Sequence, residues 1–323
     1  MRYRSAQRLP GNISEIGYGM WGMGGWTGSD DSESSGALDR AVELGCNFFD
    51  TAWAYGDGRS ERLLGSLVRR HPGQTLQVAT KVPPKNRAWP ARATMSADDV
   101  FPYEHVIGYT RMSARNLGVE RIDLQQLHVW DDSWADSDGW RRAALELKRE
   151  GLIGAFGISV NRWEPRNVLR ALETGLIDSV QVVYNIFDQA PEDMLLPICQ
   201  RKGIAVIARV PFDEGSLTGT LSVESRWPDG DWRNIYFATH HLAETLPRVE
   251  ALKRDAEGWG IDLADLALRF ILSHPAVTTT IPGMRRTHHV EANLAASDLP
   301  RLQPSVLRCL MEHRWDRVPD ERP

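Results

Sequence analysis

The sequence predicts an α/β protein of the (β/α)8, or TIM barrel, class that forms one domain over residues 1–323. Strand-like and helix-like segments alternate along the whole chain, and eight segments are strand-like. Repeated units of this kind predict a parallel sheet, and eight of them in a chain of this length predict a closed barrel. Many helical segments also end in a glycine, which suits the left-handed turn after a helix. These glycines are Gly45, Gly118, Gly151, Gly175 and Gly203.

The alternative arrangement of such units is an open, doubly wound sheet. That fold carries a G-x-G-x-x-G turn between its first strand and the following helix. None of the expected strands is followed by such a turn. The sequence therefore favours the barrel.

The expected strands are short apolar runs, and the expected helices repeat apolar residues every three or four positions. The strands cover residues 16–21, 47–50, 76–81, 122–128, 154–159, 179–184, 204–209 and 277–281. The helices cover residues 35–44, 60–70, 103–117, 140–149, 165–174, 191–201, 242–259, 263–273 and 288–296. Long connections follow three strands, at residues 83–102, 129–139 and 211–234. Long loops in a compact domain are usually lids or binding loops.

The composition gives no reason to expect a nucleic acid or a membrane as partner. Hydrophobic residues make up 42% of the chain and the net charge is −5, as in ordinary globular proteins. No apolar run approaches the roughly 20 residues needed to span a bilayer. Cys46, Cys199 and Cys309 stand far apart, so neither a metal site nor a redox pair is expected. We expect a cytoplasmic protein; the sequence does not indicate its oligomeric state.

Reactive side chains stand at or just after the ends of three expected strands. Asp50 ends the second strand and Tyr55 follows it, while Lys81 and His128 end the third and fourth. Chemistry in such barrels occurs at the carboxyl ends of the strands, so we expect these four residues to meet there. A free tyrosine, with a pKa near 10, is a poor acid at neutral pH, and a nearby ammonium lowers its pKa. Tyr55 could then protonate a carbonyl undergoing reduction, with Lys81 beside it, Asp50 holding Lys81 and His128 polarising the substrate oxygen.

Asp, Tyr, Lys and His in this order resemble the aldo-keto reductase family, and the resemblance covers nearly the whole chain. It implies that Asp50, Tyr55, Lys81 and His128 form a catalytic tetrad. It also implies a nicotinamide cofactor, expected to be NADPH (NADP+). The chain is most similar to bacterial members of the family that carry arginine where many members stack a tyrosine on the nicotinamide; here that residue is Arg209.

Three further groups of residues resemble parts of the cofactor site in the family. Ser159 and Gln181 match residues that hydrogen-bond the nicotinamide amide, although Val160 separates Ser159 from the expected asparagine. The loop after Arg209 resembles the one that lies against the pyrophosphate. The loop residues expected to contribute are Pro211, Gly215 and Leu217.

The third group resembles the family's site for the 2′-phosphate and adenine of the cofactor. Gly283, Arg285 and Arg286 precede the last barrel helix, and a helix N-terminus with cationic side chains is a good phosphate site. His289 and Asn293 match positions near the adenine. A dibasic pair at a helix start is often only a solvated surface, so the family context carries this prediction.

Tryptophans at strand ends and in the long loops are candidates for the substrate pocket. They are Trp21, Trp53, Trp89 and Trp130. Asp131 and Asp132 follow Trp130, and aromatic faces with carboxylates suit a sugar-like or polyol-derived carbonyl. The alternative is a generic apolar funnel with the aspartates facing water.

We therefore expect an NADPH-dependent oxidoreductase that reduces an aldehyde or ketone, or oxidises the corresponding alcohol. Two other functions remain open at this stage. One is a regulatory or sensor protein that binds NADPH and turns over slowly, as the potassium-channel β-subunits of the same family do. The other is a redox-neutral epimerase that retains its cofactor.

Overall fold

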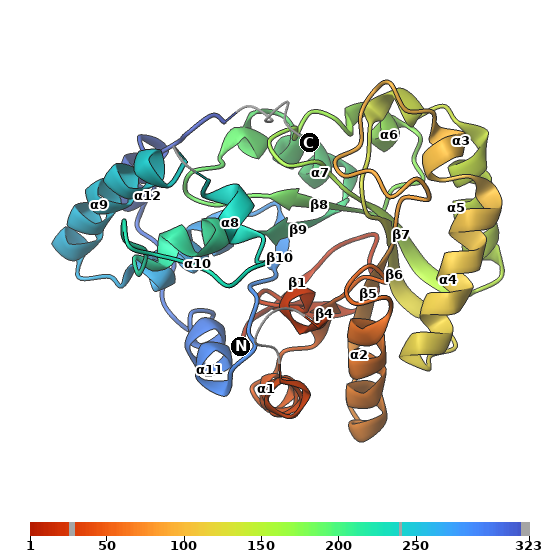
Figure 1. Cartoon of the computed structure of the whole chain (residues 1–323), viewed down its shortest axis with the longest axis horizontal. Helices are drawn as coiled ribbons and strands as arrows, with labels where there is room; N and C mark the ends of the chain where they lie inside the picture. The colour runs from red at the N-terminus through yellow and green to blue at the C-terminus, as the bar shows by residue number, and fades with distance from the viewer. Residues whose placement is uncertain (26–29, 239–240, 318–323) are drawn as a thin grey trace.

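The computed structural model describes residues 1–25, 30–238 and 241–317. Its central feature is a sheet of eight parallel strands that follow one another in chain order (Figure 1). They are β3 (Tyr18–Gly19), β4 (Phe48–Asp50), β5 (Gln77–Val82), β6 (Ile122–Leu127), β7 (Ile153–Ser159), β8 (Ser179–Val183), β9 (Ala205–Arg209) and β10 (Val277–Thr280). Every neighbouring pair is parallel.

The sheet closes between its first and last strands. Parallel bridges join Ile16 to Thr280 and Gly19 to Gly283, and the Gly17 amide donates to the Thr280 carbonyl over 2.8 Å. The expected barrel is confirmed. Its first strand is shorter than the expected residues 16–21, because only Tyr18 and Gly19 pair regularly with β4.

Helices surround the strands, with α4 and α5 on one side of the view and α9, α10 and α12 on the other (Figure 1). The main ones are α1 (Asp31–Glu43), α2 (Arg59–Arg70), α4 (Tyr103–Leu117), α5 (Asp138–Arg149), α6 (Leu169–Glu173), α7 (Leu195–Lys202), α9 (His241–Trp259), α10 (Leu263–Ser273), α11 (Thr287–Ala295) and α12 (Pro304–Met311). Two expected helices begin late, since residues 165–168 form turns and residues 190–193 a 3-10 turn. Shorter helices, α3 (Ala97–Val100) and α8 (Arg233–Tyr236), lie within the long connections.

An N-terminal hairpin, which the sequence did not predict, precedes the barrel. Its strands β1 (Tyr3–Ser5) and β2 (Asn12–Ser14) are too short to show a clear alternation of apolar residues. Ile13 of the hairpin is fully buried and packs with residues that line the barrel interior, including Phe48, Ala79 and Leu124. The hairpin thus covers the amino-terminal ends of the strands and leaves the carboxyl ends for the site.

Helices α2 and α4 pack unusually close together because α2 presents a glycine at the contact. Gly65 is buried, and a Cβ added there would collide with the backbone carbonyls of Asn116 and Leu117 at the end of α4. Gly108, in the middle of α4, is exposed and has open space around its Cα. The two positions therefore differ in packing but share a helical backbone.

We expect Gly65→Ala to destabilise the fold by about 1–3 kcal/mol, because the helices must move apart. Gly108→Ala should stabilise it by about 0.5–1 kcal/mol through helix propensity alone. Denaturation midpoints in urea, measured for both variants and the parent protein, check this. A Gly65→Ala variant as stable as Gly108→Ala would contradict the close approach of α2 and α4.

Candidate active site

Four residues from three neighbouring strand ends meet inside the barrel mouth. The Lys81 ammonium lies 2.5 Å from Asp50 Oδ1, 2.8 Å from the Thr51 carbonyl and 3.4 Å from the Tyr55 hydroxyl. The ring of Tyr55 packs edge-on against that of His128, with 5.5 Å between their centroids. The structure therefore brings together all four residues of the tetrad expected from the sequence.

Strand register explains why these side chains point inward. Ala79 lines the barrel interior, and Lys81 stands two residues further along β5, so its side chain shares that face. Lys81 is in register with Gln126 of β6, which stands two residues after the interior residue Leu124. Asp50 is the last residue of β4 and is almost completely buried.

The Asp50 carboxylate receives more donors than the sequence indicated. Its Oδ2 accepts hydrogen bonds from Gln126 Nε2 at 3.1 Å and from Gln181 Nε2 at 2.8 Å, while Oδ1 binds Lys81. Gln126 was not identified from the sequence, although its inward register beside Lys81 could have revealed it. Gln181 was expected at the nicotinamide amide, but the structure commits its Nε2 to Asp50. A buried carboxylate with these donors remains an effective anchor for the ammonium.

The electrostatics of the tetrad correct one expectation. Burial raises the pKa of Tyr55 above its usual range, and the opposing effect of Lys81 offsets only part of that shift. The sequence predicts that Lys81 lowers the pKa of the phenol, but the cost of burying a phenolate is larger. Burial alone would lower the pKa of Lys81, yet Asp50 and Tyr55 raise it overall, so it stays charged.

His128 is the neutral member of the group. Burial lowers its pKa well below the usual range, and the charge of Lys81 lowers it further. Its Nδ1 is buried and has no hydrogen-bond partner in the described parts of the chain. Trp89 stands edge-on against the same ring at a centroid distance of 4.5 Å.

Arg209, at the end of β9, is a second cation at the site. Its Nη2 donates to the Val160 carbonyl over 3.0 Å, whereas its buried Nε lacks a partner among the described residues. Burial lowers the pKa of Arg209 to about 10, and the neighbouring Arg162 contributes to that shift. Gln126 Oε1 is likewise buried without a partner in the described structure. Unsatisfied buried groups at one strand-end cluster fit a polar ligand such as a nicotinamide dinucleotide.

The remaining nicotinamide candidates lie on β7. Ser159 ends that strand in register with Gln181 and is almost fully buried. Asn161, two residues later, donates through its Nδ2 to the Ala91 carbonyl at 3.0 Å and to Glu164 at 2.7 Å. Its amide nitrogen is thus used within the protein.

The expected pyrophosphate loop follows Arg209 and contains the 3-10 segment η4 (Asp213–Thr218). Pro211 and Leu217 are buried. Gly215 has a φ of 104° and open space where a side chain would stand. Only its backbone lines that space, as close approach of a phosphate requires.

The expected 2′-phosphate and adenine residues lie before and along α11, which follows β10, the strand paired with β9. Gly283 also has open space at its Cα, and Arg286 is the residue that precedes the first turn of α11. The Arg286 side chain is 61% exposed and lies 3.6 Å from Glu33. His289 and Asn293 are four residues apart on α11 and so share one face of it.

The tryptophans expected at the substrate pocket separate into different environments. Trp89 and Trp21 are exposed, and Trp89 contacts His128. Trp53 packs edge-on against Tyr109 at 4.8 Å and donates to Met112, so it is fixed against α4. The assignment of Trp130 to the pocket was wrong.

Trp130 is fully buried in an aromatic cluster with Trp134 and Trp140, at centroid distances of 5.8 and 5.3 Å. The aspartates beside it are also structural. Asp131 Oδ1 accepts from the Ser133 amide and hydroxyl. Asp132 accepts from the backbone amides of residues 170 and 171, at the start of α6. The sugar-like substrate thereby loses the residues that suggested it, because their side chains satisfy local turns and a helix end.

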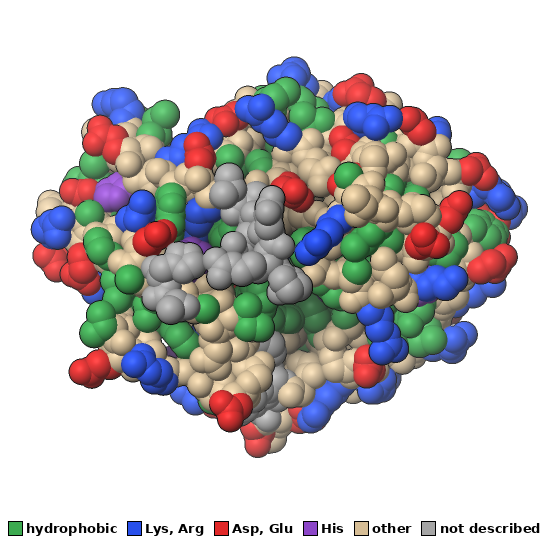
Figure 2. Space-filling model, turned by 45° about the horizontal axis from the view of Figure 1, so that its top comes forward, with side chains coloured by type: hydrophobic (Ala, Val, Ile, Leu, Met, Phe, Trp, Pro, Cys, Tyr) green, Lys and Arg blue, Asp and Glu red, His purple; other side chains and the backbone are tan. Residues whose placement is uncertain are grey.

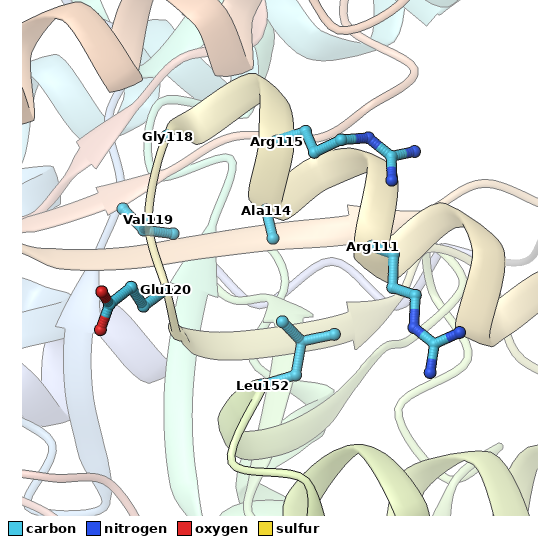
Figure 3. A pocket seen from close by; sticks show the side chains of 7 residues that line it. All are labelled: Arg111, Ala114, Arg115, Gly118, Val119, Glu120 and Leu152. Carbon is cyan, nitrogen blue, oxygen red and sulfur yellow. The ribbon is translucent and has the colours of Figure 1, made fainter.

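The surface adds little to the definition of the site. Figure 2 shows hydrophobic side chains around the centre of one face, with acidic and basic side chains mixed around its edge. The hollow in Figure 3 lies at the amino-terminal ends of β6 and β7, far from the tetrad. There Ala114, Val119 and Leu152 form an apolar floor between Arg111, Arg115 and Glu120.

No helix within residues 1–25, 30–238 and 241–317 is long and apolar enough to cross a membrane. The same residues contain no group of three or more His, Cys, Asp or Glu that could hold a metal ion.

Comparison with known proteins places this geometry in a family. Residues 15–314 match the model of the aldo/keto reductase family. The chain is 28% identical over 327 residues to the uncharacterized oxidoreductase YqkF of Bacillus subtilis, covering 97% of this chain and 96% of that protein. It is 27% identical to the NADH-specific methylglyoxal reductase of Escherichia coli, covering 89% and 90% of the two chains.

A solved structure agrees with these sequence matches. The holo form of an aldo-keto reductase from Bacillus halodurans resembles this chain with a TM-score of 0.78 and 26% identity, over 99% of each chain. The family match spans the strands and loops that carry the tetrad and the expected cofactor residues. The chain therefore belongs to the aldo/keto reductase family and is an NAD(P)H-dependent oxidoreductase.

Proposed function

We propose that this protein, as a single barrel domain, reduces an aldehyde or ketone with NADPH and uses Tyr55 as the proton donor. The observation that carries the proposal is the position of the Lys81 ammonium, fixed by Asp50 and 3.4 Å from the Tyr55 hydroxyl. The nicotinamide supplies a hydride to the carbonyl carbon when it is bound. The carbonyl oxygen then needs a proton, and Tyr55 is placed to give one.

The raised pKa of Tyr55 suits this role. Burial keeps the phenol protonated through the neutral range, which is the form a proton donor must have. The Lys81 ammonium then stabilises the phenolate as the proton leaves, so its effect is largest in the transition state. Asp50 keeps that ammonium charged and in place.

His128 would bind the substrate oxygen in its neutral form. Its low pKa means that it does not compete with Tyr55 as an acid at neutral pH. A neutral imidazole can donate one hydrogen bond to the carbonyl oxygen and so help to polarise it. Trp89, packed against the His128 ring, orients it from the solvent side.

The preference for NADPH rests on Arg285 and Arg286 before the first turn of α11. Family membership alone does not decide it, because one relative is named an NADH-specific reductase. A phosphate at this position would meet the backbone amides of the helix start and two guanidinium groups.

The substrate is proposed to be a small carbonyl compound that meets an aromatic entrance. Trp89 and Trp21 are the exposed aromatic candidates near the strand ends, while the aspartates that suggested a sugar serve the fold.

A panel of carbonyl compounds, with NADPH followed by absorbance, separates the possible functions. Net NADPH oxidation supports the reductase; product formed without it indicates an epimerase, and tight binding without turnover indicates a sensor.

Tyr55→Phe should lower the rate of carbonyl reduction by about 10²–10⁴-fold, because positioned general acids contribute that much. NADPH binding should be retained, since only a hydroxyl is removed. Tyr103→Phe, on the outer helix α4, is the matched control and should behave like the parent protein. Near-parental reduction by Tyr55→Phe, where hydride transfer limits the rate, would remove Tyr55 from the role of proton donor.

The pH profile of reduction should lack a histidine transition. Because the pKa of His128 lies well below its usual range, kcat/KM should not change near the ordinary value of about 6.5. Because burial raises the pKa of Tyr55, loss of activity by phenol ionisation should appear only above the usual value of about 10. A transition near pH 6.5 that disappears in His128→Asn would show that His128 titrates in the working range.

Replacing both Arg285 and Arg286 with alanine should raise KM for NADPH much more than KM for NADH, because only NADPH carries the 2′-phosphate. Arg40→Ala provides the control, because the Arg40 side chain extends from α1 and binds Glu291, a residue of α11 outside the arginine pair. Measurement of KM for both cofactors in each variant checks the prediction. Equal effects on NADPH and NADH would make the arginine pair a general surface feature.

A further inference from the structure

The last described residue, Arg317, is buried against the expected cofactor loop. Its side chain is 4% exposed and forms ion pairs with Asp188, after β8, and with Asp213, at the start of η4. The distance from Arg317 Nη1 to Asp213 Oδ1 is 2.9 Å. Its guanidinium also lies over the ring of Trp163, 5.0 Å from the centroid. One side chain from the C-terminal segment thus joins three loops at the barrel mouth.

The loop that Arg317 contacts has a backbone that requires support. Val210, Asp213 and Glu214 have φ values of 57°, 45° and 56°, in the left-handed region that non-glycine residues seldom adopt. Such conformations persist only where surrounding contacts fix them, and they cluster at ligand sites. The same segment carries Gly215, whose open backbone was expected to face the pyrophosphate.

Asp213 is the residue through which that support acts. Its carboxylate is fully buried and accepts hydrogen bonds from Ser216 Oγ at 2.7 Å and Tyr236 at 2.5 Å, besides its pair with Arg317. The Ser216 bond spans the turn that contains Gly215. Asp213 therefore links the shape of the loop directly to Arg317.

A second arginine holds the neighbouring loop residue. Arg162 pairs with Glu214 and lies over the ring of Tyr236, 4.7 Å from the centroid. Arg162 belongs to the segment after β7, and both it and Arg317 contact Tyr236. Arg162 therefore gives the loop a second ionic contact beside that of Arg317.

We infer that Arg317 is a positioning residue that holds the loop of residues 213–218 in its cofactor-binding conformation, so that the C-terminal segment sets cofactor affinity and release. The inference rests on the proposed function, because the loop must contact the cofactor. It assigns to Arg317 no part in proton transfer. Its effect should therefore appear in binding rather than in the chemical step.

Arg317→Met should weaken NADPH binding, measured by quenching of tryptophan fluorescence in the full-length protein. If the loop then occupies its binding conformation a tenth of the time, the apparent Kd rises about tenfold. Faster dissociation of NADPH in stopped-flow experiments should account for most of that rise. At saturating NADPH, kcat should not fall, since the lost interaction serves binding alone.

Arg314→Met is the matched control. Arg314 lies three residues earlier and pairs with Asp193 at 2.7 Å, so it anchors the same segment without contacting the loop. Its variant should bind NADPH as the parent protein does.

Because Arg317→Met leaves two buried carboxylates unpaired, Arg317→Lys and Tyr236→Phe provide gentler changes. Each should weaken NADPH binding, and by less than Arg317→Met.

Three results would overturn the inference. Equal NADPH affinity for the Arg317 and Arg314 variants would limit Arg317 to anchoring the chain end. A lower kcat at saturating NADPH with unchanged Kd would place Arg317 in the chemistry instead. If the parent protein itself bound neither NADPH nor NADH, the proposed function would fail and the inference with it.

Discussion

The ion pair between Lys81 and Asp50 is the interaction on which the site depends. Lys81 is fully buried, and a buried ammonium without a carboxylate would lose its charge or unfold its surroundings. Asp50 prevents this, and Gln126 and Gln181 fix the second oxygen of its carboxylate. Four strands, β4, β5, β6 and β8, therefore contribute one group each to a single charged centre inside the barrel.

Around this centre the protein separates charged groups from neutral ones. Burial keeps Tyr55 protonated and His128 neutral, while Lys81 stays charged beside Asp50. In the proposed mechanism the neutral groups contact the substrate carbonyl, and the Lys81 ammonium lies 3.4 Å from the Tyr55 hydroxyl. Proton transfer from Tyr55 would then be assisted by a charge that is already fixed in place.

The sequence predicted the barrel and the tetrad because both depend on strand ends, which apolar runs reveal well. The predictions from the sequence failed where they depended on the direction in which a side chain points. Trp130 follows a strand end and Trp89 lies within a long loop, yet Trp130 packs in the core and Trp89 contacts His128. Asp131 and Asp132 serve turns, which depend on chain geometry that composition does not show. Arg317 was missed because its carboxylate partners, Asp188 and Asp213, lie more than 100 residues away in the sequence.

The most direct measurement is a double-mutant cycle between Lys81 and Tyr55 with Asp50 left intact in every variant, because Asp50 keeps the Lys81 ammonium charged. Lys81 is proposed to act on the reaction through the Tyr55 hydroxyl, which it contacts. Lys81→Met should therefore greatly slow carbonyl reduction when Tyr55 is present and have little further effect in Tyr55→Phe. An equal loss of rate from Lys81→Met in both backgrounds would show that Lys81 acts independently of Tyr55.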